Sequence, residues 1–172
     1  GLDSEGAVAL DIGASTGGFT EVLLARGAAR VYAVDVGHGQ FHARLRDDAR
    51  VTVLERTNAR HLSAAQVPEP VDLVVCDASF ISLTVVLPAA LQLARPGAAL
   101  VALIKPQFEA GRSEVGKGGV VRDPSVHAAV CTRISDWLEG AMGWTVEGVA
   151  PSPITGPKGN REFLLLARKP LG

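Results

Sequence analysis

The length, composition and charge of the chain fit a single globular domain with a buried core. The chain has 172 residues, of which 47% are hydrophobic, and its formal net charge at pH 7 is -1. A chain of this size can bury a sizeable core. Its near-neutral charge excludes a global attraction to nucleic acid, so any polyanion would have to meet a local patch. Charged residues, Gly or Pro interrupt every long apolar stretch well short of a membrane span, and no secretory signal peptide is recognisable.

The two cysteines, Cys76 and Cys131, have the spacing of neither a metal site nor a disulfide framework. We expect both to be reduced core residues of a cytoplasmic protein, and we expect no metal. The chain begins at Gly1 without Met, so we expect it to be a piece of a longer protein.

The first element that carries chemistry is a glycine-rich loop between a strand and a helix. An apolar run over residues 7–12 enters the loop, and residues 19–26 then show apolar side chains at helical spacing. Glycines allow a tight turn and the close approach of a ligand, and the helix N-terminus offers N–H groups. The pattern predicts a nucleotide-like cofactor.

Two details of this loop favour S-adenosyl-L-methionine over a dinucleotide. Ser15 stands where the second glycine of G-x-G-x-x-G would be. Asp11, just before the first glycine, would repel a pyrophosphate, whereas it could hold the amino group of a methionine moiety. The predicted cofactor-binding residues of this element are Asp11, Gly13, Ala14, Ser15, Thr16, Gly17, Gly18 and Phe19.

The second and third predicted strands end in further polar candidates. Residues 30–36 read as a buried strand that reaches Asp35, and an acid there can accept both ribose hydroxyls of an adenosine. The alternative is a solvated strand-end residue. Val36 joins the predicted cofactor-binding residues, as does Asp77 at the end of the fourth predicted strand. A short helix over 39–45 and a strand over 51–55 follow, after which Asn58 could bond an adenine edge or serve as a turn residue.

The fourth and fifth predicted strands place a carboxylate beside a lysine. Residues 71–77 form an apolar run that ends in Asp77, as expected for a central parallel strand. A helix over 83–94 stops at the turn 95–97, and a strand over 98–104 leads into Lys105. A lysine there needs a nearby carboxylate, and Asp77 ends the adjacent strand. Such a pair could also be a network that only fixes the strand ends.

The remaining segments complete an α/β fold. Residues 107–121 are predicted to be a mobile loop, and a helix begins at Asp123-Pro124. Strands over 144–149 and 163–167 have no helix between them, so they must be antiparallel neighbours. We therefore predict a Rossmann-like methyltransferase fold, with a seven-stranded, mostly parallel sheet, an antiparallel last strand and helices on both faces.

Six sequence blocks carry a resemblance to a known family: ALDIGASTGGFT (9–20), VYAVDVG (31–37), CDASFISL (76–83), LIKPQFE (103–109), KGGVVRD (117–123) and SPITGPKGN (152–160). Together they resemble the TlyA or hemolysin A family of FtsJ-like ribosomal RNA 2'-O-methyltransferases. The resemblance implies S-adenosyl-L-methionine as cofactor, ribosomal RNA or ribosomal subunits as partner, and transfer to cytidine 2'-hydroxyls in the cytoplasm.

The resemblance also implies the catalytic residues. In the family a Lys-Asp-Lys-Glu tetrad acts on the ribose hydroxyl, and by motif its last three members are similar to Asp77, Lys105 and Glu162. The chemistry agrees, because the hydroxyl must lose a proton as it attacks the sulfonium methyl group. A partly desolvated lysine can take or share that proton, and carboxylates can orient the ammonium.

One departure from the family concerns the tetrad's first lysine, which precedes the first strand in the family. No lysine precedes Asp11 here, and the S4-like RNA-binding domain that the family usually carries upstream is also absent. We therefore expect residues 1–172 to be the FtsJ-like methyltransferase domain alone, able in principle to hold cofactor without being active. Arginines and lysines on the loops could line an RNA path, although each alone is more often a solvated charge: Arg112, Lys117, Arg122, Lys158 and Arg161.

Two other functions stay open at this stage. A small-molecule O-methyltransferase would keep the glycine loop and Asp35 but would have an apolar pocket in place of the RNA groove. A membrane-active hemolysin without an enzymatic role is the second alternative, and the lack of a basic amphipathic helix argues against it.

Overall fold

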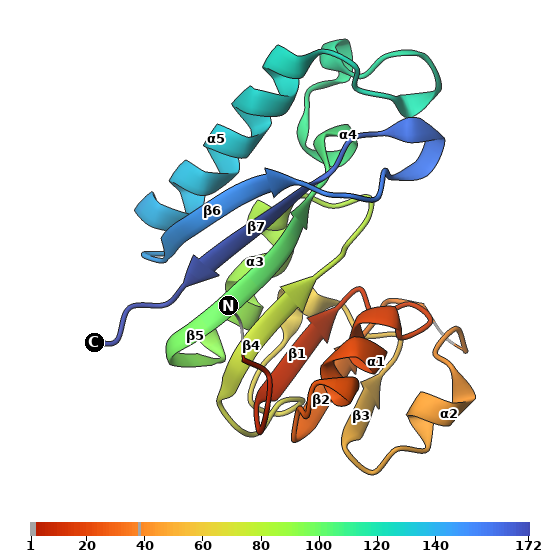
Figure 1. Cartoon of the computed structure of the whole chain (residues 1–172), viewed down its shortest axis with the longest axis vertical. Coiled ribbons are helices and arrows are strands. Elements are labelled where there is room, and N and C mark those ends of the chain that lie inside the picture. The colour runs from red at the N-terminus through yellow and green to blue at the C-terminus, as the bar shows by residue number, and fades with distance from the viewer. Residues whose placement is uncertain (1–2, 38) are drawn as a thin grey trace.

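A seven-stranded sheet runs through the molecule in this computed structural model (Figure 1), which describes residues 3–37 and 39–172. The strands lie in the order β3-β2-β1-β4-β5-β7-β6. Neighbours from β3 to β5 pair in parallel, whereas β7 is antiparallel to both β5 and β6. This confirms the predicted fold class. The strands are β1 (Val8–Ile12), β2 (Arg30–Val34), β3 (Val51–Leu54), β4 (Val71–Cys76), β5 (Ala94–Ile104), β6 (Thr145–Pro151) and β7 (Phe163–Arg168).

Helices cover both faces of the sheet and bury two apolar clusters. Leu23 and Leu24 of α1 pack on one face, and Leu87 of α3 and Ile134 of α5 pack on the other. No described helix is long and apolar enough to cross a membrane. The helices are α1 (Gly18–Ala25), α2 (Ala43–Arg46), α3 (Leu83–Gln92), α4 (Pro106–Glu109) and α5 (Pro124–Gly140), with 3-10 turns η1 (Ala59–His61), η2 (Arg112–Glu114), η3 (Lys117–Gly119) and η4 (Pro157–Gly159).

Two elements start four residues away from their predicted positions, whereas the other boundaries differ by at most two residues. Helix α2 starts at Ala43 and not at Gly39, because His42 caps it by accepting a bond from the Arg44 N–H. Strand β5 starts at Ala94, so the predicted turn 95–97 lies inside the strand. It is accommodated by an irregular pairing with β4 and by a positive φ of 83° at Gly97.

The predicted loop 107–121 contains most of the short helix α4 and the turns η2 and η3, and its mobility stays a prediction. Glu109 anchors this segment, and its side chain is only 2% exposed. Its carboxylate accepts bonds from Ser82 Oγ at 2.7 Å and from the Leu83 N–H at 2.8 Å. Arg133 of α5 donates to the Glu109 carbonyl at 2.6 Å. These bonds tie the segment to the first turn of α3 and to α5.

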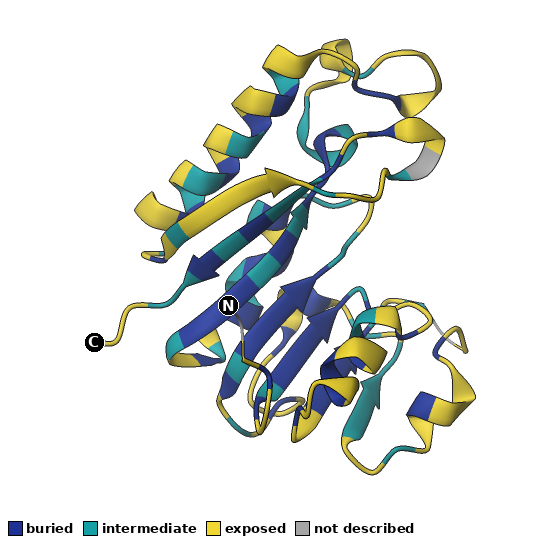
Figure 2. Cartoon of the chain, in the orientation of Figure 1, coloured by how far each residue is buried: buried dark blue, intermediate teal, exposed yellow. Residues whose placement is uncertain are grey.

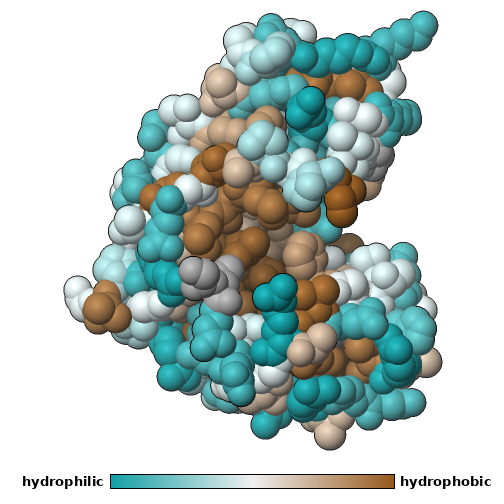
Figure 3. All heavy atoms as spheres, in the orientation of Figure 1, coloured by the Kyte–Doolittle hydropathy of each residue, from teal (hydrophilic) through white to brown (hydrophobic). Residues whose placement is uncertain are grey.

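Part of one sheet face remains half-exposed. Strands β1 and β4 are almost entirely buried, whereas most of β6 is exposed (Figure 2). On the α1 side of β5 and β7, the side chains of Val101, Leu103, Leu164 and Leu166 are only half-buried. Apolar surface accordingly gathers in the middle of this face (Figure 3).

Candidate active site

The carboxyl ends of the parallel strands surround two adjoining cavities, each of about 420 Å³. The first is lined by the ends of β1, β2 and β4 and by the segment after β3. The second lies over residues 13–16 and the start of α1. Gly13, Ser15 and Asp77 line both cavities, so they stand where the two meet. In doubly wound sheets this edge is where ligands bind.

The glycine loop has the backbone geometry that its sequence predicts. Gly13 has a φ of 77°, and a Cβ placed there would lie 2.2 Å from the Asp77 carbonyl oxygen. Gly17 has a φ of 106°, and a Cβ there would lie 2.6 Å from Leu45 Cδ1. Only glycine fits these two positions without displacement. Ser15, which replaces the second glycine of the dinucleotide pattern, also has a positive φ, of 52°.

Asp35 ties this loop to the end of β2. Its Oδ2 accepts a bond from the Ser15 N–H, and its Oδ1 accepts one from the Gly37 N–H at 3.0 Å. The carboxylate also lines the first cavity. Because each carboxylate oxygen has a second lone pair, Asp35 can still accept hydrogen bonds from the hydroxyl groups of a ligand there.

Asp11 lies beneath the loop and lines neither cavity. It is fully buried, its Oδ2 accepts a bond from Thr20 Oγ1 at 2.7 Å, and burial raises its pKa to about 6. Its Oδ1 is buried without a hydrogen-bond partner among the described residues. A buried, unpartnered carboxylate oxygen costs free energy unless a donor reaches it. Contact with an amino group of the cofactor stays a prediction.

The raised pKa of Asp11 predicts a pH-dependent stability difference. A folded-state pKa above 3.8 means that the folded chain holds this proton longer, so the contribution of Asp11 to stability falls as pH rises from about 4 to about 6. We expect Asp11→Asn to be more stable than the parent at pH 7 by about 2–3 kcal/mol, a gain that disappears below about pH 4. Urea unfolding at several pH values measures this, and a pH-independent difference would contradict it.

Asn58 and Val36 both reach the first cavity. Asn58 Oδ1 accepts a bond from the Arg60 N–H at 3.0 Å, which caps η1. The two interpretations of Asn58 are therefore compatible, since a turn residue can also present its amide nitrogen to a ligand. Val36 is 73% exposed at the cavity wall.

Lys105 and Asp77 form an ion pair across the ends of β5 and β4, which confirms the expected partner. Lys105 Nζ also donates to Ser79 Oγ at 3.1 Å. The lysine side chain is 9% exposed, whereas that of Asp77 is 36% exposed. The pair thus has one buried member and one that faces the cavities.

Glu162 contacts helix α4, which follows Lys105, and the structure gives no direct bond between Glu162 and Lys105 among the described residues. It is buried, and its Oε2 accepts a bond from Gln107 Nε2 at 2.9 Å. Gln107 lies two residues after Lys105, in the first turn of α4. A Cβ on Gly156 would lie 2.2 Å from Glu162 Oε2, so the glycine makes room for the carboxylate. Asp77 and Lys105 are thus in direct contact, whereas Glu162 bonds to Gln107, two residues after Lys105.

Sequence reasoning missed three residues of this site, namely Ser79, Phe80 and Gln107. All three lie within the blocks 76–83 and 103–109, and their place in these family-like blocks was the only sequence signal that could have identified them. Phe80 is 88% exposed and has a positive φ of 64°. Its ring lies 4.8 Å from that of Phe108 between centroids, and it lines the first cavity. A non-glycine residue with a positive φ beside a cavity is a candidate for a functional role.

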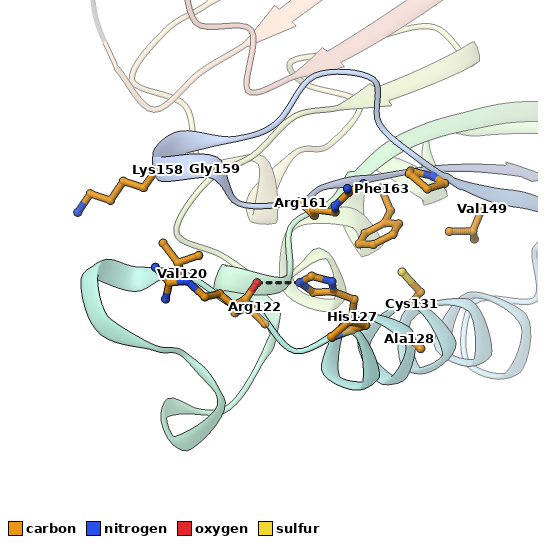
Figure 4. A pocket seen from close by; sticks show the side chains of 13 residues that line it. Val120, Arg122, His127, Ala128, Cys131, Val149, Lys158, Gly159, Arg161 and Phe163 are labelled. Atoms are coloured by element: carbon orange, nitrogen blue, oxygen red, sulfur yellow. Dashed lines mark hydrogen bonds between the residues drawn. The ribbon is translucent and has the colours of Figure 1, made fainter.

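The five predicted RNA-binding cations are all exposed but do not form one group. Arg122, Lys158 and Arg161 line a separate cavity of about 740 Å³, shown in Figure 4. Arg112 on η2 and Lys117 on η3 lie outside its lining. Within residues 3–37 and 39–172, no cluster of three His, Cys, Asp or Glu side chains could hold a metal ion.

The sheet order, the antiparallel β7 and the glycine loop at the strand ends together define a doubly wound methyltransferase fold. The sequence matches the description "FtsJ-like methyltransferase" over residues 1–169. The chain belongs to the FtsJ-like methyltransferase family.

Similar proteins carry two kinds of name. The 16S/23S rRNA (cytidine-2'-O)-methyltransferase TlyA of Mycobacterium tuberculosis is 55% identical over 163 residues, which are 92% of this chain and 59% of that protein. Hemolysin A of Brachyspira hyodysenteriae is 42% identical over 166 residues, 95% of this chain and 68% of that protein. The solved structure of a candidate hemolysin from Streptococcus thermophilus has a TM-score of 0.94 at 43% identity, covering 98% of this chain and 61% of that one.

Proposed function

We propose that the chain is the catalytic domain of an S-adenosyl-L-methionine-dependent methyltransferase that acts in the cytoplasm on ribose 2'-hydroxyls of ribosomal RNA, with cytidine as the target base. The observation that carries this proposal is the Lys105–Asp77 pair beside the glycine-loop cavities. The name of the TlyA relative supports the RNA substrate. Because the chain spans 59% of that relative's length, substrate and activity are proposed for the longer protein.

The residues at the two cavities fit S-adenosyl-L-methionine. Asp35 and Asn58 would bind the ribose and the adenine in the first cavity. The methionine part would lie along residues 13–19, above the unpartnered Oδ1 of Asp11. Gly13 would allow the close approach, since any side chain there would meet the Asp77 backbone. When bound, the cofactor would supply a methyl group from its sulfonium and would keep the electron pair of the broken carbon–sulfur bond as a neutral thioether.

The chain's own residues would manage the proton of the acceptor hydroxyl. Lys105 would take that proton in its amine form, which forms when the ammonium of the ion pair gives up its own proton, while the oxygen forms its new bond to the methyl carbon. Asp77 would stabilise the resulting ammonium, because its carboxylate already pairs with Lys105 Nζ. Gln107 and Glu162 would fix the first turn of α4, which directly follows Lys105. Lys105 is the proposed base, and Glu162 would act through Gln107.

Phe80 would position the base of the acceptor nucleotide. Enzymes that act on single nucleotides in RNA bind bases removed from their stack, and aromatic side chains hold such bases by stacking. The Phe80 ring lies three residues after Asp77, is exposed and is supported by Phe108. It is therefore well placed to hold a base whose ribose faces Asp77.

The tetrad's first lysine and an S4-like RNA-binding domain would belong to a segment that precedes this chain in the longer protein. A fusion of the chain to the N-terminal segment of the TlyA relative should therefore transfer tritium from labelled cofactor to ribosomal subunits, with counts that ribonuclease removes. Transfer to small hydroxyl compounds but not to RNA would favour the small-molecule alternative. Leakage of liposomes that survives substitution of Asp35 would favour the hemolysin.

Substitution of Asp35 tests the cofactor site directly. We expect Asp35→Ala to weaken binding of S-adenosyl-L-methionine by about 10- to 100-fold, because the two hydrogen bonds that the ribose hydroxyls would donate to the charged carboxylate are lost. Isothermal calorimetry on the folded variant measures this. Asp47→Ala is the matched control, since Asp47 is exposed at the end of α2, outside both cavity linings. Equal affinity of the parent and Asp35→Ala would remove this role.

A further inference from the structure

A cavity larger than either glycine-loop cavity lies outside the proposed active site. It is about 740 Å³ and is lined by the start of α5, the end of β6 and the segments 120–122 and 158–163. None of its lining residues also lines the glycine-loop cavities. The cavity therefore needs an explanation other than cofactor binding.

Its walls are fixed by buried hydrogen bonds. Asn160 Oδ1 accepts a bond from the Val121 N–H, and Asn160 Nδ2 donates to the Gly119 carbonyl, each at 3.0 Å. His127 Nε2 lies 2.8 Å from the Val121 carbonyl oxygen, which can only accept, so this nitrogen carries the proton. The shape is thus built into the fold, which lowers the cost of ordering a ligand.

The inner surface is apolar and aromatic. The rings of His127 and Phe163 lie 5.7 Å apart between centroids. Ala128, Cys131 and Val149 complete this side (Figure 4). Burial raises the pKa of the Cys131 thiol, which therefore stays neutral. Such a surface suits a flat, uncharged ring system.

The rim is cationic. Arg122 and Arg161 come from the chain segments before α5 and before β7, and the exposed Lys158 extends away from the ring pair (Figure 4). Among the described lining residues there is no Asp or Glu, although the whole chain has a net charge of -1. This local excess of positive charge is complementary to a phosphate.

Residues 161–163 link the cavity to the active site, because their neighbouring side chains point alternately to the one and to the other. Arg161 and Phe163 line the cavity, whereas Glu162 between them is buried against Gln107 and Gly156. The Glu162 carbonyl accepts a bond from the Ser152 N–H at 2.8 Å, which holds the segment beside the end of β6. A ligand in the cavity would sit directly behind the buried carboxylate.

We propose that this cavity binds one unpaired nucleotide of the RNA substrate, distinct from the methyl acceptor, with its base against Phe163 and His127 and its phosphate at Arg161 and Arg122. The inference rests on the proposed function, since it assigns a second contact to the same RNA. Rings that stack bases and cations that hold the adjoining backbone are the combination by which proteins bind single-stranded RNA.

Filling the cavity tests this proposal. Ala128 is exposed on α5 and lines the cavity, whereas its exposed neighbour Ala129 does not, so Ala128→Trp and Ala129→Trp form a matched pair. We expect Ala128→Trp to weaken binding of a fluorescent single-stranded oligoribonucleotide about tenfold or more, and Ala129→Trp to change it by less than about twofold. Arg161→Glu should weaken binding similarly, unlike the exposed Arg26→Glu. Affinity for S-adenosyl-L-methionine should be the same in all four variants.

A photocrosslink locates the bound nucleotide. An oligoribonucleotide with one 4-thiouridine should crosslink to peptides from residues 120–131 or 158–163. Equal affinity of the Ala128→Trp and Ala129→Trp variants, crosslinks confined to other segments, or equal competition by an acidic peptide would each overturn the proposal. If the fusion protein transferred methyl groups despite such results, only this inference would fail. If it transferred none while the paired variants still differed, only the methyltransferase proposal would fail.

Discussion

Alanine at position 105 is expected to lower methyl transfer by about 10²- to 10⁴-fold, the range that positioned acid–base groups contribute. The reason is that Lys105 Nζ, paired with Asp77 and bonded to Ser79, is the proposed acceptor of the hydroxyl proton. Cofactor affinity should change little, because Lys105 lines neither glycine-loop cavity. Tritium transfer by the fusion protein and calorimetry with S-adenosyl-L-methionine measure the two quantities separately.

Arginine at the same position separates catalysis from scaffolding. Arg keeps a positive charge beside Asp77 but cannot take a proton in this pH range. If the ion pair only fixed the strand ends, Lys105→Arg would restore much of the lost activity. We expect it to stay as inactive as Lys105→Ala while unfolding at a urea concentration closer to that of the parent.

Alanine at position 13 should have the largest effect on the cofactor site and on stability. The residue has a φ of 77°, and its new Cβ would lie 2.2 Å from a backbone oxygen, which cannot move aside as a flexible side chain can. We expect the free energy of unfolding to fall by about 2–4 kcal/mol and cofactor binding to become undetectable.

Gly18→Ala is the control for this effect on stability. Gly18 is the first residue of α1, and a Cβ there would meet nothing within 4 Å. Because alanine also favours the helix, we expect the stability of Gly18→Ala to equal or slightly exceed that of the parent. Urea unfolding of the two variants provides the comparison. A loss of similar size in both would show that close backbone approach is not the cause.

The sequence could predict the site where chain order and strand direction alone decide the geometry. Asp77 and Lys105 follow adjacent parallel strands, whose carboxyl ends must meet at one edge of the sheet. The glycine loop was predictable for a similar reason, because a tight turn between a strand and a helix restricts the possible residues. The seven strands and the antiparallel last pair were predicted in the same way.

The rest depends on contacts that no local pattern encodes. The bond from Gln107 to Glu162 joins residues 55 positions apart and exists only because α4 forms directly after Lys105. The burial of Asp11 beneath its own loop reflects packing around Thr20, which the position of an acid before a glycine does not reveal. The cavity beside Phe163 likewise needs α5, β6 and two loops in their final places.

Arg161 and Phe163 face the cavity, whereas Glu162 between them is buried on the other side of the chain. The number of residues in this segment is therefore as important as their identity. Neighbouring side chains of an extended chain point to opposite sides, so a shift by one residue would exchange the two sets. With β7 held in register, an insertion of a single amino acid just before Phe163 would move the carboxylate to the outward place of Arg161 and put the inserted residue against Gly156. Changes in length here should therefore be far less tolerated than changes of residue type, in contrast to an ordinary surface loop.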